Sequence, residues 1–253
     1  MGEVAFWISM GVVAIGTSIL SGVLGMAGGM LLLSALLLKL EPTIAIPVHG
    51  IVQLVSNASR AWFLREHVRK KFVIPFALPL LPAAALGVVL LSVIPASAGK
   101  MLIGAFVLFF TWRASRPREK GNPPEHPART LAIAGAIVGF FSTLVGATGP
   151  LIAPFILALE LAPSATVGTM AACQVFQHAS KVLVFGFAGF DFRQQVGPAL
   201  ALSVCAIVGS AVGTRWLERI DRDLFRRVVK IVLTLLALQL LASGAWSLGH
   251  ASR

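Results

Sequence analysis

The chain carries one interrupted apolar pattern twice, at positions 121 residues apart. Residues 21–29 read Ser-Gly-Val-Leu-Gly-Met-Ala-Gly-Gly, and residues 142–150 read Ser-Thr-Leu-Val-Gly-Ala-Thr-Gly-Pro. The same offset relates Gln53 to Gln174 without a gap. Each copy consists of a glycine-broken apolar segment, a second apolar segment, and a helix with a Gln and a cation. In a hydrophobic chain, two such interrupted segments indicate a transporter binding site between two repeats.

The composition predicts a membrane protein. Hydrophobic residues make up 57% of the chain, charged residues make up 12%, and the mean hydropathy is +0.88. A soluble domain carries about 25% charged residues. Apolar stretches near membrane-spanning length recur along nearly the whole chain, and they are continuous, unlike the short alternating strands of a barrel. We therefore expect an all-α, polytopic transmembrane helix bundle of about 8–10 segments.

Ten apolar segments can be delimited along the chain. Their expected ranges are 4–24, 27–40, 44–64, 72–94, 99–114, 130–148, 150–162, 164–188, 195–216 and 224–248. The second and the seventh are short, so each is expected to be a half-helix or a re-entrant piece. If the first pair of segments in each repeat forms a re-entrant hairpin, the number of segments falls to eight.

The basic residues lie mainly in short connections between apolar segments. Fifteen of the 21 Lys and Arg residues gather around 65–71, 113–129 and 215–230, so the net charge of +11 does not indicate nucleic-acid binding. Because cytoplasmic loops are enriched in Lys and Arg, these three connections are expected inside. The repeat counterpart of 65–71 is 187–194, which has one Asp and one Arg and is expected outside. The two halves therefore form an inverted-topology repeat with both termini outside.

A proline-rich stretch separates the two halves. Residues 116–127 contain four prolines and cannot form a span. We therefore expect residues 1–115 to form the first transmembrane repeat, 116–129 to form a cytoplasmic linker, and 130–253 to form the second transmembrane repeat.

Both glycine clusters stand where one apolar segment gives way to the next. They comprise Gly25, Gly28 and Gly29 in the first copy, and Gly146 and Gly149 in the second. A helix that starts inside the membrane offers free N–H groups and the positive end of its dipole to an anion. Broken backbone at this depth is tolerated only where protein buries it or where it lines a cavity. The alternative is that these glycines allow close packing of helices.

Polar side chains follow each break at the identical spacing i, i+4, i+7, which places them on one helical face. The two sets are Gln53, Asn57 and Arg60, and Gln174, His178 and Lys181. Cations inside a span usually face the bundle interior and mark substrate pathways, although a cation near a helix end can instead extend to the interface. The Gln pair could instead form hydrogen bonds between helices. His178 is either a hydrogen-bonded packing residue or a candidate proton relay. A positive cavity without carboxylates favours a small anion.

Enzyme and redox functions have little support in the sequence. Such functions need a nucleophile–base set, a metal cluster or a cysteine pair, and none is visible. Cys173 and Cys205 lie inside predicted helices without a CxxC motif, which favours small buried side chains. The sequence also lacks the GxxxxGK[ST] signature of a nucleotide-binding loop. We expect no catalytic residue, no metal and no cofactor.

The glycine motifs resemble those of the TauE/SafE family of sulfite and organosulfonate exporters. The resemblance rests on residues 22–29 with Pro42 after them, and on the degenerate second copy at 139–154 with Pro163. It extends over essentially the whole chain through the repeat layout. It implies a bacterial cytoplasmic-membrane protein that exports sulfite, sulfoacetate or related small sulfur-containing anions.

The second copy departs from the fuller glycine pattern of the first. It has Thr148 and Pro150 where the first copy has Ala27 and Gly29. The two halves of a site built on these motifs are therefore not expected to be fully symmetric.

These observations predict a secondary transporter that exports a small organosulfur anion by alternating access. An anion channel is the alternative, and an integral-membrane enzyme or redox carrier is a more distant one. The predicted substrate-binding residues are Gly25, Gly28, Gly29, Gln53, Asn57, Arg60, Gly146, Thr148, Gly149, Gln174, His178 and Lys181. The expected partners are the anion and the lipid bilayer, without nucleic acid. The sequence leaves open which anion is carried, its direction, any coupling ion, and the oligomeric state, a homo-oligomer included.

Overall fold

A computed structural model describes residues 3–24, 28–113, 124–216 and 222–251. In these ranges the chain forms eleven α-helices and two short 3-10 helices, and it has no strand. The α-helices are α1 (Glu3–Leu24), α2 (Gly28–Leu36), α3 (Pro42–Phe63), α4 (Lys70–Ala77), α5 (Leu80–Val93), α6 (Ala96–Arg113), α7 (Pro127–Leu144), α8 (Gly149–Leu157), α9 (Pro163–Phe187), α10 (Val196–Trp216) and α11 (Arg222–Ala251). The 3-10 helices are η1 (Arg65–His67) and η2 (Phe192–Gln195). The prediction of an all-α helix bundle is confirmed.

The predicted apolar segments correspond to these helices, with one correction at 72–94. The structure divides this segment into α4 and α5, which are bent by 42° at the break between them. Pro75 lies inside α4, and Pro79 lies at the break. A proline lacks a backbone N–H and disfavours helical geometry in the residue before it. The single apolar segment expected here therefore consists of two helices, which together can still form one broken span.

Several helices of the described chain are long and apolar enough to cross a membrane. These are Val4–Val23, Pro127–Leu144, Phe192–Trp216 and Lys230–Leu248, and the bent α4–α5 pair is a fifth if it counts as one span. α3 and α9 are longer than most, at 22 and 25 residues, but each carries polar side chains that make it less apolar. Polar groups inside a membrane protein usually face the bundle interior, where neighbouring helices shield them. The chain is a multi-pass membrane protein.

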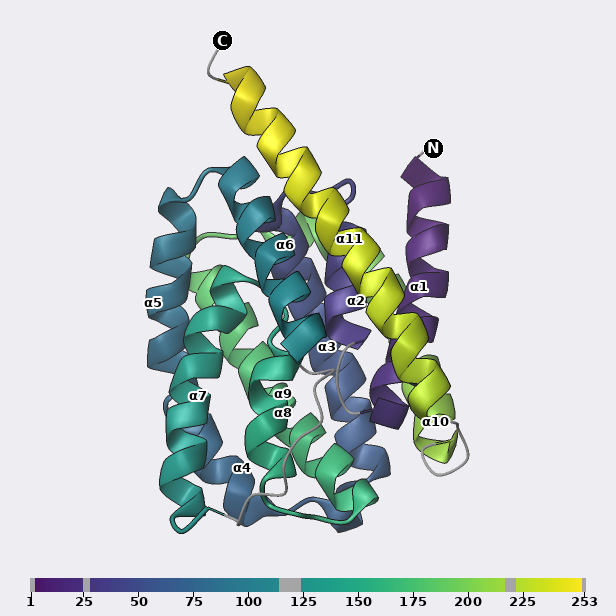
Figure 1. The fold of residues 1–253 in the computed structure, drawn as a ribbon, viewed down its shortest axis with the longest axis vertical. Helices are drawn as coiled ribbons and strands as arrows, with labels where there is room; N and C mark the ends of the chain where they lie inside the picture. The colour runs from purple at the N-terminus through teal and green to yellow at the C-terminus, as the bar shows by residue number, and fades with distance from the viewer. Residues whose placement is uncertain (1–2, 25–27, 114–123, 217–221, 252–253) are drawn as a thin grey trace.

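The helices of the two halves match closely in position and in packing. α2 and α8 begin 121 residues apart and end 121 residues apart, and α3 and α9 also begin 121 residues apart. α1 packs chiefly on α10, while its counterpart α7 packs on α4 and α5. α3 and α9 cross in the centre of the bundle (Figure 1). They run antiparallel, because Gly168 faces Leu64 whereas Gly50 faces Lys181.

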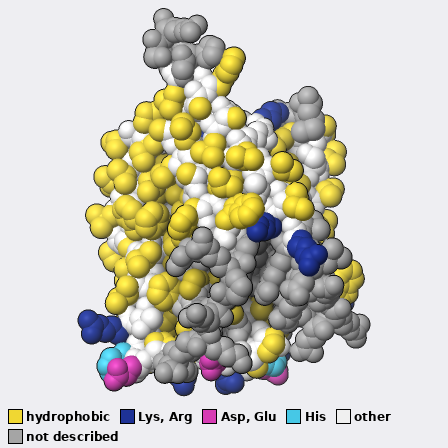
Figure 2. Space-filling view, viewed as in Figure 1, with side chains coloured by type: hydrophobic (Ala, Val, Ile, Leu, Met, Phe, Trp, Pro, Cys, Tyr) yellow, Lys and Arg dark blue, Asp and Glu magenta, His cyan; other side chains and the backbone are white. Residues whose placement is uncertain are grey.

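The connections lie at two ends of the bundle. α1 begins and α11 ends at the upper end in Figure 1. α4, which follows the basic loop after α3, lies at the lower end, where α11 also begins. Apolar side chains cover the upper and middle parts of the face in Figure 2, and the acidic and histidine side chains visible there lie at its lower end. This distribution suits a protein whose middle faces lipid.

The first short helix, α2, lies in the interior of the bundle. Every residue of α2 except Gly29 is buried, and a helix that is apolar on all sides belongs inside a protein. The larger apolar cluster surrounds α2, with side chains from α1, α6 and α11. A second cluster joins α4, α7, α8 and α9. Packing thus buries α2 almost completely, whereas α8 buries one face and leaves Pro154 and Leu157 exposed.

Candidate functional site

Both predicted breaks are present in the structure. α1 ends at Leu24 and α2 begins at Gly28, while α7 ends at Leu144 and α8 begins at Gly149. In the second break Gly146 has φ +79°, a left-handed conformation that glycine adopts easily. Pro150 lies in the first turn of α8, where a missing N–H costs nothing. Nine residues cannot cross a bilayer, so α2 and α8 are half-helices that begin inside the protein.

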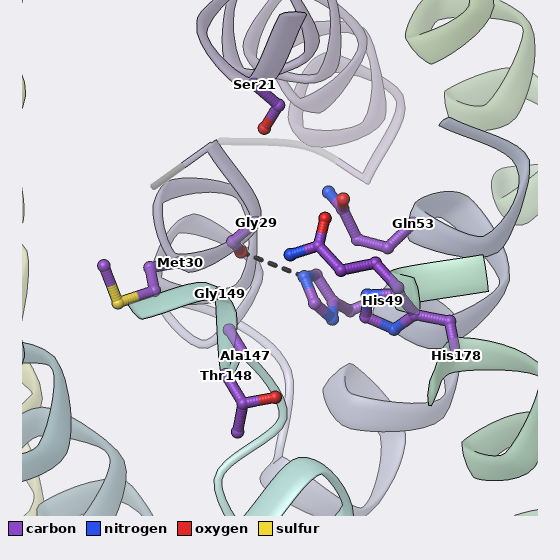
Figure 3. A pocket seen from close by; sticks show the side chains of 10 residues that line it. Ser21, Gly29, Met30, His49, Gln53, Ala147, Thr148, Gly149 and His178 are labelled. Atoms are coloured by element: carbon purple, nitrogen blue, oxygen red, sulfur yellow. Dashed lines mark hydrogen bonds between the residues drawn. The ribbon is translucent and has the colours of Figure 1, made fainter. Parts of the chain in front are cut away.

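A pocket lies where the two breaks meet (Figure 3). Side chains and backbone from α1, α2, α3, α8 and α9 form its walls. The lining residues are Ser21, Gly29, Met30, His49, Gln53, Ala147, Thr148, Gly149, Gln174 and His178. The empty space among them is about 300 Å³, a figure that includes its open mouth and so sets an upper limit on a ligand. Because that space includes open solvent, the enclosed part is smaller than a typical small-molecule pocket and suits a small ion.

The first turns of both half-helices contribute to the pocket wall. Gly29 and Met30 come from the first turn of α2, while Thr148 and Gly149 are the N-cap and the first residue of α8. The first N–H groups of a helix have no partner within it, and they stand at the positive end of its dipole. No lining residue is acidic. The pocket therefore favours negative charge.

Two histidines face each other across the interface between α3 and α9. The rings of His49 and His178 have centroids 5.7 Å apart in an edge-to-face arrangement. His49 Nε2 lies 2.9 Å from the carbonyl oxygen of Gly29, the contact drawn in Figure 3. Because a carbonyl oxygen only accepts, His49 Nε2 carries the hydrogen and donates it.

Lys181 links His178 to the second break. Its side chain is fully buried, and Nζ donates hydrogen bonds to the carbonyl oxygen of Gly146 and to His178 Nδ1, the latter at 3.3 Å. When Lys181 is protonated, its ammonium group has no lone pair, so His178 Nδ1 accepts and Nε2 of a neutral His178 carries the hydrogen. His178 can thus present an N–H donor to the pocket that it lines.

Arg60 lies in a separate polar cluster between α1, α3 and α10. Its side chain is fully buried, with Nη1 donating to Asn57 Oδ1 at 3.2 Å and Nη2 donating to Ser56 Oγ at 3.4 Å. Ser56 Oγ also lies 3.2 Å from Ser18 Oγ and 3.1 Å from Ser210 Oγ. Arg60 Nε has no hydrogen-bond partner. Arg60, like Lys181, therefore does not extend to a membrane interface.

Neither of these two buried cations is paired with a carboxylate. The ion pairs of the described residues join Arg65 to Glu66 and Lys100 to Glu41, both near the ends of helices. A buried positive charge without a counter-charge is unfavourable unless an anion can approach it. The site region therefore carries a positive charge that its own side chains do not neutralise.

The structure brings half of the predicted site residues into one pocket. Those that line it are Gly29, Gln53, Thr148, Gly149, Gln174 and His178. Those outside its lining are Gly28, Asn57, Arg60, Gly146 and Lys181, and Gly25 lies outside the described residues. A Cβ on Gly28 would collide with the backbone of Thr17, so this glycine permits the close approach of α2 to α1.

The predicted list left out four lining residues, which are Ser21, Met30, His49 and Ala147, and it also left out Gln177, which shapes the pocket from outside its lining. His49 stands four residues before Gln53, on the same face of α3, so extending the polar stripe by one turn would have found it. Gln177 donates from Nε2 to Thr148 Oγ1 at 2.8 Å and holds the start of α8. The cysteines have no part in this site, since both are free and Cys173 is buried.

The comparison with protein families agrees with this architecture. Residues 10–240 match the family described as sulfite exporter TauE/SafE. No curated protein and no solved structure matches the chain. The family match covers both helix breaks, the residues that line the pocket, and the whole of α3 and α9. The chain belongs to the sulfite exporter TauE/SafE family of membrane transport proteins.

Proposed function

We propose that this protein is a secondary transporter that exports a small organosulfur anion, such as sulfite or sulfoacetate, across the bacterial cytoplasmic membrane. The observation that carries the proposal is the meeting of two helix breaks, one from each half, at a single pocket without acidic residues. Broken helices at the interface of two repeats are the usual place for a transporter's substrate.

The chemistry of the pocket suits an oxyanion. Gln53, Gln174 and His178 supply N–H donors from α3 and α9, and the half-helices add the positive ends of their dipoles. The uncompensated charges of Lys181 and Arg60 lie behind this wall. A sulfite or sulfonate group has three oxygens that accept hydrogen bonds, so it can use donors from both halves at once.

The packing of the helices supports alternating access by an inverted repeat. α1 with α10, and α7 with α4 and α5, form two similar groups on either side of the antiparallel α3–α9 pair. We propose that residues 1–115 and 130–253 are the two repeats, joined by a cytoplasmic linker at 116–129, and that both termini are periplasmic. Rocking of the two groups would open the pocket to one side and then to the other.

Anion-dependent stabilisation of the purified protein tests the substrate class. A ligand that binds only the folded state stabilises it by about 2.7 kcal/mol at a concentration one hundred times its Kd. We expect sulfite or sulfoacetate to raise the unfolding temperature, whereas chloride and a quaternary ammonium cation do not. An equal response to all anions would contradict a specific oxyanion site.

Exchange across vesicles separates a carrier from a channel. Protein reconstituted in liposomes should release labelled sulfite faster when unlabelled sulfite is present outside, because a carrier returns faster when loaded. Release that does not respond to outside sulfite would favour the channel alternative.

A further inference from the structure

His49, which lines the pocket, has one basic ring nitrogen without a hydrogen-bond partner in the protein. His49 is fully buried, and its Nε2 is committed to the carbonyl oxygen of Gly29. Its Nδ1 is also buried and has no hydrogen-bond partner. In the neutral ring that nitrogen holds a lone pair, and a buried acceptor left without a donor is unfavourable by about 1–3 kcal/mol.

The other ring nitrogens nearby are occupied. His178 Nδ1 accepts from Lys181, and Lys181 also donates to Gly146. When Lys181 is protonated, a further proton that enters this group of side chains has one unpartnered ring nitrogen to bind, which is His49 Nδ1. His49, His178 and Lys181 form a continuous line of contacts from the first break at Gly29 to the second break at Gly146.

The charges around His49 decide when it can hold a proton. α9 presents Lys181 and His178 toward it, and Arg60 lies three turns further along its own helix. The residues of α2 that face it, Gly29 and Met30, are not titratable, and no acidic side chain lines the pocket. A second positive charge beside Lys181 is repelled in a medium of low dielectric constant, unless an anion occupies the pocket.

We propose that His49 Nδ1 takes up a proton together with the anion, so that the protein moves one proton with each anion. This inference rests on the proposed transport function. The proton forms an N–H bond with the lone pair of Nδ1 on one side of the membrane, and that bond breaks when the anion leaves on the other side. Linkage requires that each of the two ligands binds more tightly when the other is present.

The proton has two chemical sources. It comes from water, or it is the acidic hydrogen of the anion itself, as in hydrogensulfite. Sulfoacetate separates the two, because at neutral pH it is fully ionised and brings no proton. Proton movement with both anions identifies water as the source, and proton movement with sulfite alone identifies the anion.

The test is proton movement in liposomes that contain the full-length protein and a pH-sensitive dye. Anion release and internal pH are recorded together for sulfite and for sulfoacetate. We expect about one proton to move with each anion in the wild-type protein. Anion flux without any proton movement overturns this inference and leaves the transport function intact. Absence of flux with either anion overturns the transport function itself.

Two matched substitutions assign the proton to one residue. His49→Gln keeps an N–H that reaches the carbonyl oxygen of Gly29 but removes the basic nitrogen. We expect it to carry the anion with a proton ratio reduced at least about tenfold. His67→Gln makes the same exchange at an exposed residue of η1 and should leave the ratio unchanged. A wild-type ratio in His49→Gln overturns the assignment.

Calorimetry of the wild-type protein covers the case in which His49→Gln does not fold. Sulfoacetate binding is measured in two buffers of different ionisation enthalpy, and the difference gives the number of protons taken up. Uptake of about one proton per anion supports the proposal. If the binding enthalpy is the same in both buffers, and sulfite flux also carries no proton, the proposal is wrong.

Discussion

Gly146 offers the sharpest test of the break between α7 and α8, because its backbone has φ +79°. Alanine in this left-handed conformation is disfavoured by about 1–2 kcal/mol. A Cβ at this position would lie 2.5 Å from Leu33 Cδ2 and 3.1 Å from Ile46 Cγ1. Overpacking of this kind is unfavourable by about 1–3 kcal/mol. We therefore expect Gly146→Ala to lower the free energy of unfolding by about 2–5 kcal/mol.

Gly189 is a matched control for the backbone part of this effect. It has φ +88°, and a Cβ there would meet nothing within 4 Å. Gly189→Ala should therefore be less stable than the wild type by only about 1–2 kcal/mol. Denaturant unfolding of the purified protein, followed by helix content, measures both variants under the same conditions.

A double-mutant cycle with Leu33→Ala measures how much of the stability loss in Gly146→Ala comes from the clash between the new Cβ and Leu33. Removing the Leu33 side chain opens the space that the new Cβ needs, so Gly146→Ala should be milder in the Leu33→Ala background by about 1–3 kcal/mol. Equal losses in Gly146→Ala and Gly189→Ala would refute the close packing of Leu33 against the break. If both variants are as stable as the wild type, the cost assigned to alanine in a left-handed backbone conformation is refuted as well.

Three further predictions concern the pocket and the topology. Arg60→Gln should weaken sulfite binding by on the order of 1 kcal/mol in a thermal titration, because it removes a positive charge outside the pocket lining and no direct contact, and wild-type affinity would show that Arg60 is structural. Gln174→Leu should reduce the sulfite-dependent stabilisation by about 1–3 kcal/mol, because it removes a donor from the pocket wall; an unchanged response would remove Gln174 from the site. A cysteine introduced at His67 should react with an impermeant reagent only from the cytoplasm, and one at Asp191 only from the periplasm. Labelling of both from the same side would rule out the inverted repeat.

The helix boundaries could be predicted from the sequence because their signals are local. Pro163 opens α9, and Gly28 and Gly149 open the half-helices, in agreement with the apolar pattern around them. Because the two copies are 121 residues apart, a helix start identified in one half also indicated the equivalent helix start in the other half. The bend between α4 and α5 was missed because the apolar run continues across Pro79 and hides the break.

The arrangement of the site was harder to predict, because it depends on contacts between distant segments. The sequence placed Arg60 and Lys181 at equivalent positions, but their partners differ. Lys181 reaches the backbone of the second break, whereas Arg60 binds side chains of its own helix. Helical spacing gives the face on which a side chain lies, but it does not give the neighbour that the face meets.

Helices of the first half pack chiefly on helices of the second half, so the protein cannot complete its packing until the second half has been synthesised. α1 packs chiefly on α10, which begins roughly 170 residues after α1 ends. At about 5–20 residues per second, translation makes α1 wait on the order of 10–30 s for its partner. During that interval the contact face around Gly22, which later meets Gly213, is open to lipid or to other membrane proteins. α6 likewise packs chiefly on α11, so the first half stays in the membrane with these contact faces uncovered until the second half arrives.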